Sequence, residues 1–239
     1  RAIHLGADPD RTIVTGSSKY DELLAKTDRN TAGRWRRILI SDGRNPVIVA
    51  GNLRGRECSM IVEAVEMLKG EFPRLLAVVA PRHLHRVAEI RREADARKLR
   101  YCLLSRILTT RGLNVEEISI VIVDSFGLLF DLYSIADVAF CGGTFEPVGG
   151  HNIMEPAVWG KKVLYGPFIQ KVEVEHEVLE RRGIGILCRN FEEFIEHLRK
   201  TIHTNNVVPE NVVEEAIREL SGASRIYASW IMERVIHNA

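Results

Sequence analysis

A segment with two glycine pairs holds the residues of this chain that are best suited to chemistry. It spans residues 142–156 and reads Gly-Gly-Thr-Phe-Glu-Pro-Val-Gly-Gly-His-Asn-Ile-Met-Glu-Pro. Its glycines are Gly142, Gly143, Gly149 and Gly150. Because glycine has no Cβ, backbone N–H groups at such positions can approach a ligand closely. A helix is expected to begin at Asn152, and a helix N-terminus adds unpaired donors and a partial positive charge. The pattern predicts a binding site for a phosphate group.

The polar residues that end this segment each have two interpretations. Asn152 at a helix N-cap with Glu155 three residues later is a capping-box pattern, which by itself stabilises a helix by about 1 kcal/mol. The Glu155 carboxylate could also accept a hydrogen bond from a sugar hydroxyl of a ligand. His151 could bond the same ligand or only line the turn. No second His or Cys stands at ligand spacing, so no metal site is expected.

Arg82 is the strongest single candidate for binding an anion. It follows an apolar run and Pro81, which places it at the end of a predicted strand. A guanidinium group pairs in bidentate fashion with a phosphate or a carboxylate. The alternative is a surface arginine in a basic loop, since His83 and His85 are its neighbours.

Short apolar runs that alternate with amphipathic segments indicate how these residues are positioned. The runs are rich in Val, Ile and Leu, which is typical of buried parallel strands. They are Val47–Ala50, Leu75–Val79, Ile118–Val123, Val138–Cys141, Lys162–Tyr165 and Gly185–Cys188, with Tyr101–Leu104 as a weaker seventh. The pattern predicts a doubly wound, mostly parallel, Rossmann-like α/β sheet that binds its ligand at the carboxyl ends of the strands. Asn52, Arg82, Asp124 and the glycine segment all follow such ends, so we expect them to converge.

The two ends of the chain do not fit the strand–helix alternation, and we expect residues 46–207 to form the sheet domain. Residues 1–45 are predicted to hold the end of a helix (Ala2–Gly6), a short strand (Thr12–Thr15) and a polar linker (Ser17–Asn45). Within the linker, Arg34-Trp35-Arg36-Arg37 is either a solvated face or a contact for an anionic partner. Residues 208–239 are predicted to form two helices, Pro209–Glu219 and Ala223–His237. The second has an apolar stripe made of Ile226, Tyr227, Trp230, Ile231 and Val235.

Composition excludes several classes of protein. The formal net charge of +1 gives no general attraction to nucleic acid or membrane. The 46% hydrophobic and 27% charged residues are ordinary for a soluble domain. The 4 cysteines are widely spaced, so reduced thiols are expected. No apolar run approaches the roughly 18–20 residues that span a bilayer. The chain begins at Arg1 rather than Met, so we expect it to be part of a longer protein.

The glycine segment resembles the signature of the 3-deoxy-manno-octulosonic acid (Kdo) transferases. Further short motifs occur in the order in which that family has them, and the similarity extends from about Arg1 to about Cys188. These motifs are Thr15-Gly16, Lys19-Tyr20-Asp21, Val49-Ala50-Gly51, Pro81-Arg82-His83, Val123-Asp124-Ser125-Phe126-Gly127 and Gly160-Lys161 through Gly166-Pro167. The enzymes of this family transfer Kdo from CMP-Kdo to the lipid A precursor in Gram-negative bacteria.

The resemblance implies the C-terminal, donor-binding half of a GT-B glycosyltransferase. Residues 1–45 would then hold the end of a missing N-terminal domain and a linker, and residues 208–239 would pack back toward that domain. The enzyme would be inverting and metal-independent, and its catalytic glutamate would lie in the missing domain. It would act on the lipid A precursor at the cytoplasmic side of the inner membrane, without nucleic acid. The implied donor-site residues are Lys19, Asn52, Arg82, His83, Gly127, Gly142, Gly143, Gly149, Gly150, His151, Asn152 and Glu155.

The loop after the first strand departs from the family pattern. Family members usually have a Ser-Thr pair where this chain has Asn52-Leu53, and Arg54 and Arg56 follow closely. We therefore expect the loop to meet the donor through different hydrogen bonds. Three alternatives remain at this point. They are a nucleotide-sugar epimerase of the UDP-GlcNAc type, another GT-B glycosyltransferase and a nucleotide-sensing module without enzymatic activity.

Overall fold

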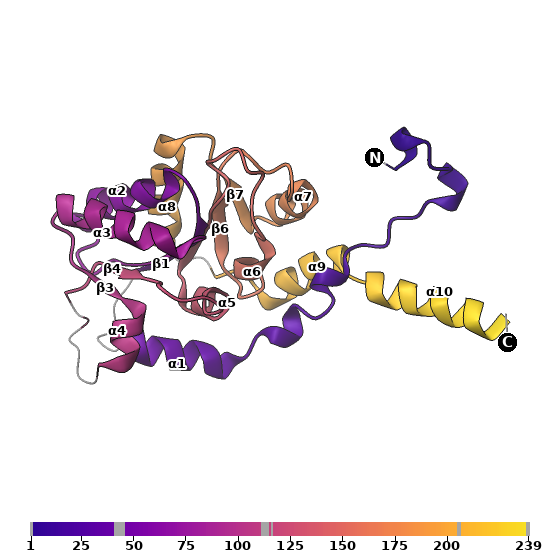
Figure 1. Cartoon of the computed structure of the whole chain (residues 1–239), viewed down its shortest axis with the longest axis horizontal. Coiled ribbons are helices and arrows are strands. Elements are labelled where there is room, and N and C mark those ends of the chain that lie inside the picture. Colours follow the sequence, from indigo (N-terminus) through magenta and orange to yellow (C-terminus); the bar gives the residue numbers. More distant parts are fainter. Residues whose placement is uncertain (1, 41–45, 111–114, 116, 205–206, 238–239) are drawn as a thin grey trace.

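The computed structural model describes residues 2–40, 46–110, 115, 117–204 and 207–237. Its centre is one parallel sheet with the strand order β3-β4-β2-β1-β5-β6-β7 (Figure 1). The strands are β1 (Val47–Leu53), β2 (Leu76–Pro81), β3 (Tyr101–Leu103), β4 (Ile120–Ile122), β5 (Val138–Cys141), β6 (Lys162–Tyr165) and β7 (Gly185–Leu187). The seven apolar runs of the sequence are all strands, which confirms the predicted parallel α/β sheet.

Helices connect the strands, and three more described helices follow the last strand, the last of them ending at His237. Within the described residues the α-helices are α1 (Arg29–Leu39), α2 (Glu57–Lys69), α3 (Val87–Ala96), α4 (Leu104–Thr109), α5 (Leu129–Leu132), α6 (Met154–Ala157), α7 (Glu173–Arg181), α8 (Phe191–Thr204), α9 (Glu210–Leu220) and α10 (Ala223–His237). Short 3₁₀ helices are η1 (Ile3–Leu5), η2 (Pro9–Arg11), η3 (Ser18–Tyr20), η4 (Leu24–Lys26), η5 (Leu84–Arg86) and η6 (Tyr133–Ile135).

The sheet lies between two layers of helices because successive side chains of a strand point to opposite faces. In β1, Ile48 and Ala50 pack in one apolar cluster with residues of α2, α3 and α8. Val47 and Val49 pack on the other face, with residues of α1, α4 and α5. On that second face, a further cluster joins β5 and β6 to α6, α7 and α9. Both faces of the central strands are therefore dry, which explains why the strands read as continuous apolar runs.

The polar segment before β1 was predicted to be a linker, but it also forms a helix. It contains α1, which begins after Asp28, whose Oδ1 accepts the Asn30 N–H at 2.9 Å. Trp35 in the middle of this helix is 1% exposed and packs in the core beside Leu39. The prediction of a solvated basic face is thus wrong for Trp35, because the helical period turns its ring inward while Arg34, Arg36 and Arg37 stay exposed. Residues 41–45 of the expected linker lie outside the described residues.

Residues 12–15 form no strand, contrary to the prediction, whereas Ile3–Leu5 form a short 3₁₀ turn that ends at Gly6. The chain that follows, at residues 17–21, is joined to the end of α9 and the start of α10. The Ser17 N–H donates to the Leu220 carbonyl at 2.8 Å, and the Asp21 carboxylate accepts the N–H groups of Gly222 and Ser224. Figure 1 shows the first residues of the chain and α10 extending away from the rest of the molecule.

The two C-terminal helices differ in where they pack. We expected both to turn toward an absent domain, but α9 packs on α7 of this domain and buries Val213, Ile217 and Leu220. In α10 the predicted apolar stripe is largely exposed, with Trp230 at 44% and Ile231 at 61%. The side chain of Val235 lies outside the described part of the chain.

Candidate functional site

A cavity of about 300 Å³ lies at the carboxyl ends of the strands, beside the position where β1 and β5 are neighbours. The connections after these two strands lead to helices on opposite faces, which in a doubly wound sheet opens a crevice for a ligand. The cavity is lined by Asn52, Ala80, Pro81, Arg82, Val123, Ser125, Phe126, Gly127, Leu129, Phe130, His151, Asn152 and Glu155. Six predicted site residues therefore meet here, namely Asn52, Arg82, Gly127, His151, Asn152 and Glu155.

The other predicted residues lie around the cavity rather than in its wall. His83 is exposed next to Arg82, and its ring stacks on His85 at a centroid distance of 5.6 Å. The positive charge of Lys19 opposes the rise that burial causes in the Glu155 pKa. Its Nζ also donates to the Tyr20 hydroxyl at 3.3 Å.

The glycine pairs do not offer the free phosphate-binding amides that the sequence suggested. The N–H of Gly142 donates to the Gly51 carbonyl, and that of Gly150 donates to the Gly143 carbonyl, both at 2.8 Å. The N–H of Gly143 donates to Glu57 at 2.7 Å. These glycines are needed for close packing instead. A Cβ on Gly143 would lie 2.7 Å from the His151 ring, and Gly149 and Gly150 have φ angles of 86° and 89°.

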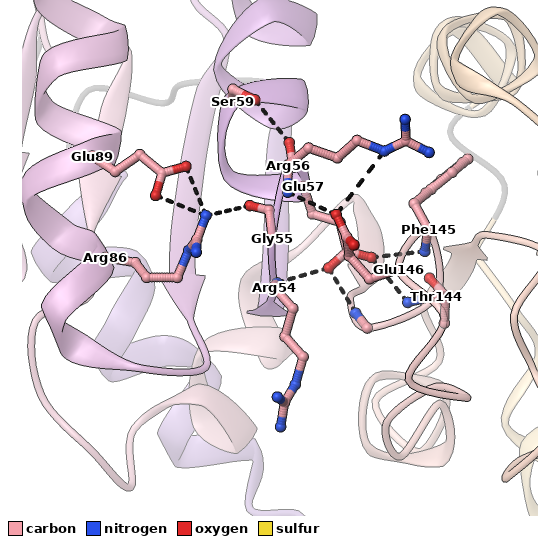
Figure 2. A network of polar contacts seen from close by, with 11 residues as sticks. Arg54, Gly55, Arg56, Glu57, Ser59, Arg86, Glu89, Thr144, Phe145 and Glu146 are labelled. Carbon is pink, nitrogen blue, oxygen red and sulfur yellow. Dashed lines mark hydrogen bonds and ion pairs between the residues drawn. The ribbon is translucent and has the colours of Figure 1, made fainter.

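The buried carboxylate of Glu57 holds the two loops together, and the sequence analysis did not place it in the site. The side chain is 0% exposed. One oxygen accepts the N–H groups of Arg54 at 2.8 Å and Gly143 at 2.7 Å. The other accepts those of Thr144 at 2.9 Å and Phe145 at 2.8 Å. Figure 2 shows these hydrogen bonds, which we call the Glu57 network.

Burial raises the pKa of Glu57, and the four N–H groups oppose this rise. Only the ionised carboxylate can accept from all four donors, since a proton on either oxygen would face an N–H group. The network thus fixes the loop after β1 against the loop after β5. The sequence did contain a sign of this role, since Glu57 directly precedes the apolar residues of α2 and a buried charged residue is uncommon.

Asn152 and Glu155 do not form the predicted capping box. The helix begins at Met154 rather than at Asn152, and it contains four residues. The Asn152 Oδ1 accepts the Met154 N–H at 3.3 Å, and its Nδ2 donates to Glu155 Oε1 at 3.1 Å. Asn152 therefore both caps the turn and orients the Glu155 carboxylate. Burial raises the pKa of that carboxyl group, and Asn152, Lys19 and Arg82 oppose the rise.

His151 is held in its neutral form by its surroundings. Its Nε2 accepts a hydrogen bond from the Nε of Arg54 at 3.0 Å, which leaves the ring proton on Nδ1. Burial, together with the positive charges of Arg54, Arg82 and Lys171, lowers the pKa of His151 to about 4. At neutral pH this ring can donate through Nδ1 without adding positive charge.

The loop after β4 forms the opposite side of the cavity. Asp124 accepts hydrogen bonds from the N–H and the hydroxyl of Ser105, at 3.0 and 2.5 Å, so its role is to join this loop to α4. Phe126 follows at the cavity with 73% of its surface exposed, and Gly127 has a φ of 85°. Sequence reasoning named Gly127 and missed Phe126, although an aromatic residue in a polar loop at a strand end was a usable signal.

The base of the cavity depends on Gly51. A Cβ at this position would lie 2.1 Å from the hydroxyl oxygen of Tyr133 and 2.7 Å from a methyl carbon of Leu129. The Tyr133 hydroxyl is fully buried without a hydrogen-bond partner in the described structure. Leu129 also lines the cavity. The absence of a side chain at Gly51 therefore leaves the space in which Tyr133 and Leu129 pack against β1.

The described residues contain no group of three or more His, Cys, Asp or Glu side chains that could hold a metal ion. None of their helices has both the length and the apolar character needed to cross a membrane.

Among known proteins, two sequence relatives of this chain are each 32% identical to it. No family model matches the chain. It is 32% identical over 235 residues to a bifunctional glycosyltransferase/methyltransferase of Fusobacterium nucleatum, which covers 98% of this chain and 34% of that protein. It is also 32% identical over 175 residues to the 3-deoxy-D-manno-octulosonic acid transferase of Aquifex aeolicus, covering 73% of this chain and 46% of that enzyme. The chain thus spans between a third and a half of these relatives.

A solved structure shows which part of such a protein has this fold. The C-terminal CMP-Kdo binding domain of WaaA from Acinetobacter baumannii superposes with a TM-score of 0.68 at 21% identity, covering 80% of this chain and 97% of that domain. The predicted fold and the predicted resemblance are both confirmed. The chain is a relative of the Kdo transferases and has the fold of their C-terminal domain.

Proposed function

We propose that this chain binds CMP-Kdo as the donor-binding half of an inverting, metal-independent glycosyltransferase that adds Kdo to the lipid A precursor. The observation that carries the proposal is the cavity at the carboxyl ends of β1, β2 and β4. It places Arg82, His151, Asn152 and Glu155 around a space that suits a nucleotide. The Kdo transferases among the relatives support this choice of donor.

The chemistry of the cavity assigns a role to each group. Arg82 is exposed and forms no ion pair within the described residues, so its guanidinium can pair with the donor phosphate. Glu155, oriented by Asn152, can accept from a ribose hydroxyl. Phe126 offers an exposed aromatic face for the base. Because three of the glycine amides are already bonded, phosphate binding depends on side chains more than the sequence suggested.

In the described cavity wall only His151 and Glu155 could act as a general base for the acceptor hydroxyl, and Glu155 is assigned to the donor ribose. His151 has a pKa of about 4 and its Nε2 already accepts from Arg54, so it is too weak a base at neutral pH. We propose that the base is a carboxylate outside this chain. The same proposal places the whole protein at the cytoplasmic side of the inner membrane, where its lipid acceptor lies, with no role for nucleic acid.

The test is a titration of this chain with CMP, UMP and UDP in the presence of EDTA. We expect saturable binding of CMP that does not need metal, and a loss of at least tenfold in affinity in Arg82→Ala. Arg92→Ala, on the exposed side of α3, is the matched control and should bind CMP as the parent chain does. A preference for UDP would favour an epimerase or another glycosyltransferase. The absence of saturable binding to any of the three would refute the donor-binding proposal for this chain.

A further inference from the structure

The loop between β1 and α2 carries a second arginine near the cavity whose position is fixed by the backbone. Asn52 in this loop has a φ of 58°, and Gly55 has a φ of 46°. Both values lie in the left-handed region, which Asn and Gly tolerate better than other residues. The loop therefore has a defined, folded-back shape, and Arg54 stands between its two left-handed residues.

Three sets of contacts hold this loop in place, as Figure 2 shows. The Glu57 network binds the N–H of Arg54 itself at 2.8 Å. Glu146 Oε1 accepts the Arg56 N–H at 2.8 Å. An Arg86 terminal nitrogen donates to the Gly55 carbonyl at 2.5 Å and to Glu89 at 2.7 Å. The backbone around Arg54 is thus anchored on both sides before its side chain makes any contact.

The Arg54 side chain runs away from the Glu57 carboxylate (Figure 2) and reaches a residue of the cavity wall. Its Nε donates to His151 Nε2 at 3.0 Å. This bond uses one of the five N–H donors of the guanidinium group, which leaves those of its two terminal nitrogens. In the described structure these nitrogens have no acceptor, and the side chain is partly buried. A fixed guanidinium with two free terminal nitrogens is the geometry that binds a carboxylate in bidentate fashion.

Several positive side chains act on His151. The charges of Arg54, Arg82 and Lys171 all lower its pKa. No ion pair joins any of them to a carboxylate within the described residues. The one carboxyl group in the described cavity wall, Glu155, is hydrogen-bonded to Asn152 and acts electrostatically on Arg82 without forming an ion pair, so it balances at most one of these charges. A ligand with one phosphate charge would leave part of this charge uncompensated, whereas a ligand with two separate anionic groups would balance it.

We propose that Arg54 is a specificity-determining residue that binds a second anionic group of the ligand, the carboxylate of an acidic sugar attached to the nucleotide phosphate. Arg82 lines the cavity and takes the phosphate, while Arg54 lies beyond His151 and meets the sugar. This inference rests on the proposed function and adds a residue in the loop that departs from the family pattern. It also explains why a charged side chain can stand there, next to a neutral His151.

The test compares CMP with freshly prepared CMP-Kdo on the parent chain and on two variants, Arg54→Gln and Arg56→Gln. At pH 8 CMP carries about two negative charges on its phosphate, because the second phosphate pKa is about 6. CMP-Kdo carries one charge on its phosphodiester and one on its carboxylate. Since the total charges are nearly equal, a general loss of positive potential would weaken both ligands alike. Only a carboxylate subsite would separate them.

We expect Arg54→Gln to weaken CMP-Kdo binding by about tenfold or more and CMP binding by less than about twofold. Arg56→Gln is the matched control and should change neither, because the Arg56 side chain is 77% exposed and its Nε lies 4.0 Å from Glu146 Oε1. Arg54→Lys, which keeps the charge but not the bidentate geometry, should recover only part of the affinity and serves if the glutamine variant fails to fold. Equal weakening of both ligands, or no weakening of CMP-Kdo, would overturn the inference while leaving CMP binding by the parent chain intact. Binding of neither ligand by the parent chain would instead refute the proposed function.

Discussion

The loops after β1 and β5 form one side of the cavity, and residues 125–127 after β4 form the other. On the first side the backbone donors of Arg54, Gly143, Thr144 and Phe145 are all bound by Glu57. On the second side, no hydrogen bond joins Ser125, Phe126 or Gly127 to another part of the described protein, and Phe126 is 73% exposed. Buried hydrogen bonds fix the backbone of the first side before a ligand binds. On the second side, residues 125–127 remain available to contact a ligand. The difference indicates that a change to the Glu57 network acts mainly on stability, whereas a change to the exposed Phe126 acts mainly on binding.

The largest effect is expected when the Glu57 network is broken. In Glu57→Gln the amide has one acceptor oxygen, so the two N–H groups bound by the other oxygen face an NH₂ group. An unsatisfied buried donor costs about 1–3 kcal/mol, so we expect the free energy of unfolding to fall by about 2–4 kcal/mol. Urea unfolding followed by circular dichroism measures this change.

A matched control for this variant is available on the same helix. Glu63 is only partly buried and has no partner in the Glu57 network, so Glu63→Gln should stay within about 0.5 kcal/mol of the parent chain. If the two variants were equally stable, the buried carboxylate would not be what holds the two loops together.

The next effect concerns the base of the cavity. In Gly51→Ala the new methyl group would lie 2.1 Å from the Tyr133 hydroxyl oxygen, so the buried ring and Leu129 must shift. Overpacking of this kind typically costs about 1–3 kcal/mol. Thermal unfolding should show a lower midpoint for this variant, together with weaker CMP binding because Leu129 lines the cavity.

The control is Gly33→Ala in α1, where a Cβ meets nothing within 4 Å. Alanine is favoured over glycine inside a helix by about 0.5–1 kcal/mol, so this variant should unfold at a higher temperature than the parent chain. A Gly51→Ala protein as stable as the parent would mean that the base of the cavity adapts at little cost.

The open side of the cavity is tested with Phe126→Ala. Because the ring is 73% exposed, its removal should leave the unfolding free energy within about 0.5 kcal/mol of the parent value. If it stacks on the base, CMP binding should weaken by about 1–3 kcal/mol, which isothermal titration calorimetry measures. Trp230→Ala on α10, where the ring is 44% exposed and far from the cavity lining, should not change CMP binding. Unchanged affinity in Phe126→Ala would remove base stacking from the proposed site.

Near neutral pH the smallest effect is the pH dependence that His151 gives to stability. Its pKa is lowered to about 4 in the folded protein and returns to about 6.5 on unfolding. Between these values the unfolded chain binds a proton that the folded protein does not, so stability is full above pH 6.5 and falls as the pH drops toward 4. The parent chain should therefore lose stability faster than His151→Gln over this window in urea titrations at several pH values. Parallel pH profiles for the two proteins would contradict the neutral state of this ring.

Much of the architecture and part of the site could be predicted from local patterns. The strands were found because burial on both faces requires unbroken runs such as Val138–Cys141. Arg82 and Gly127 were placed correctly because the carboxyl ends of parallel strands share one edge of the sheet. Trp35 was misjudged because its neighbours are arginines, and only the helical period of α1 shows that the ring turns inward.

The sequence by itself determined the parallel sheet, the edge of that sheet where the cavity lies and the position of Arg82 at that edge. Only the tertiary structure decided which polar groups are free. Glu57 and Gly143 are 86 positions apart along the chain, and so no local pattern shows that the carboxylate occupies the amides that looked suited to a phosphate. In the same way, the bond between Arg54 and His151 depends on two loops that meet only when β1 pairs with β5. Hydrogen bonds of this kind are made between segments that the fold brings together, and their donors and acceptors can be assigned only after it has formed.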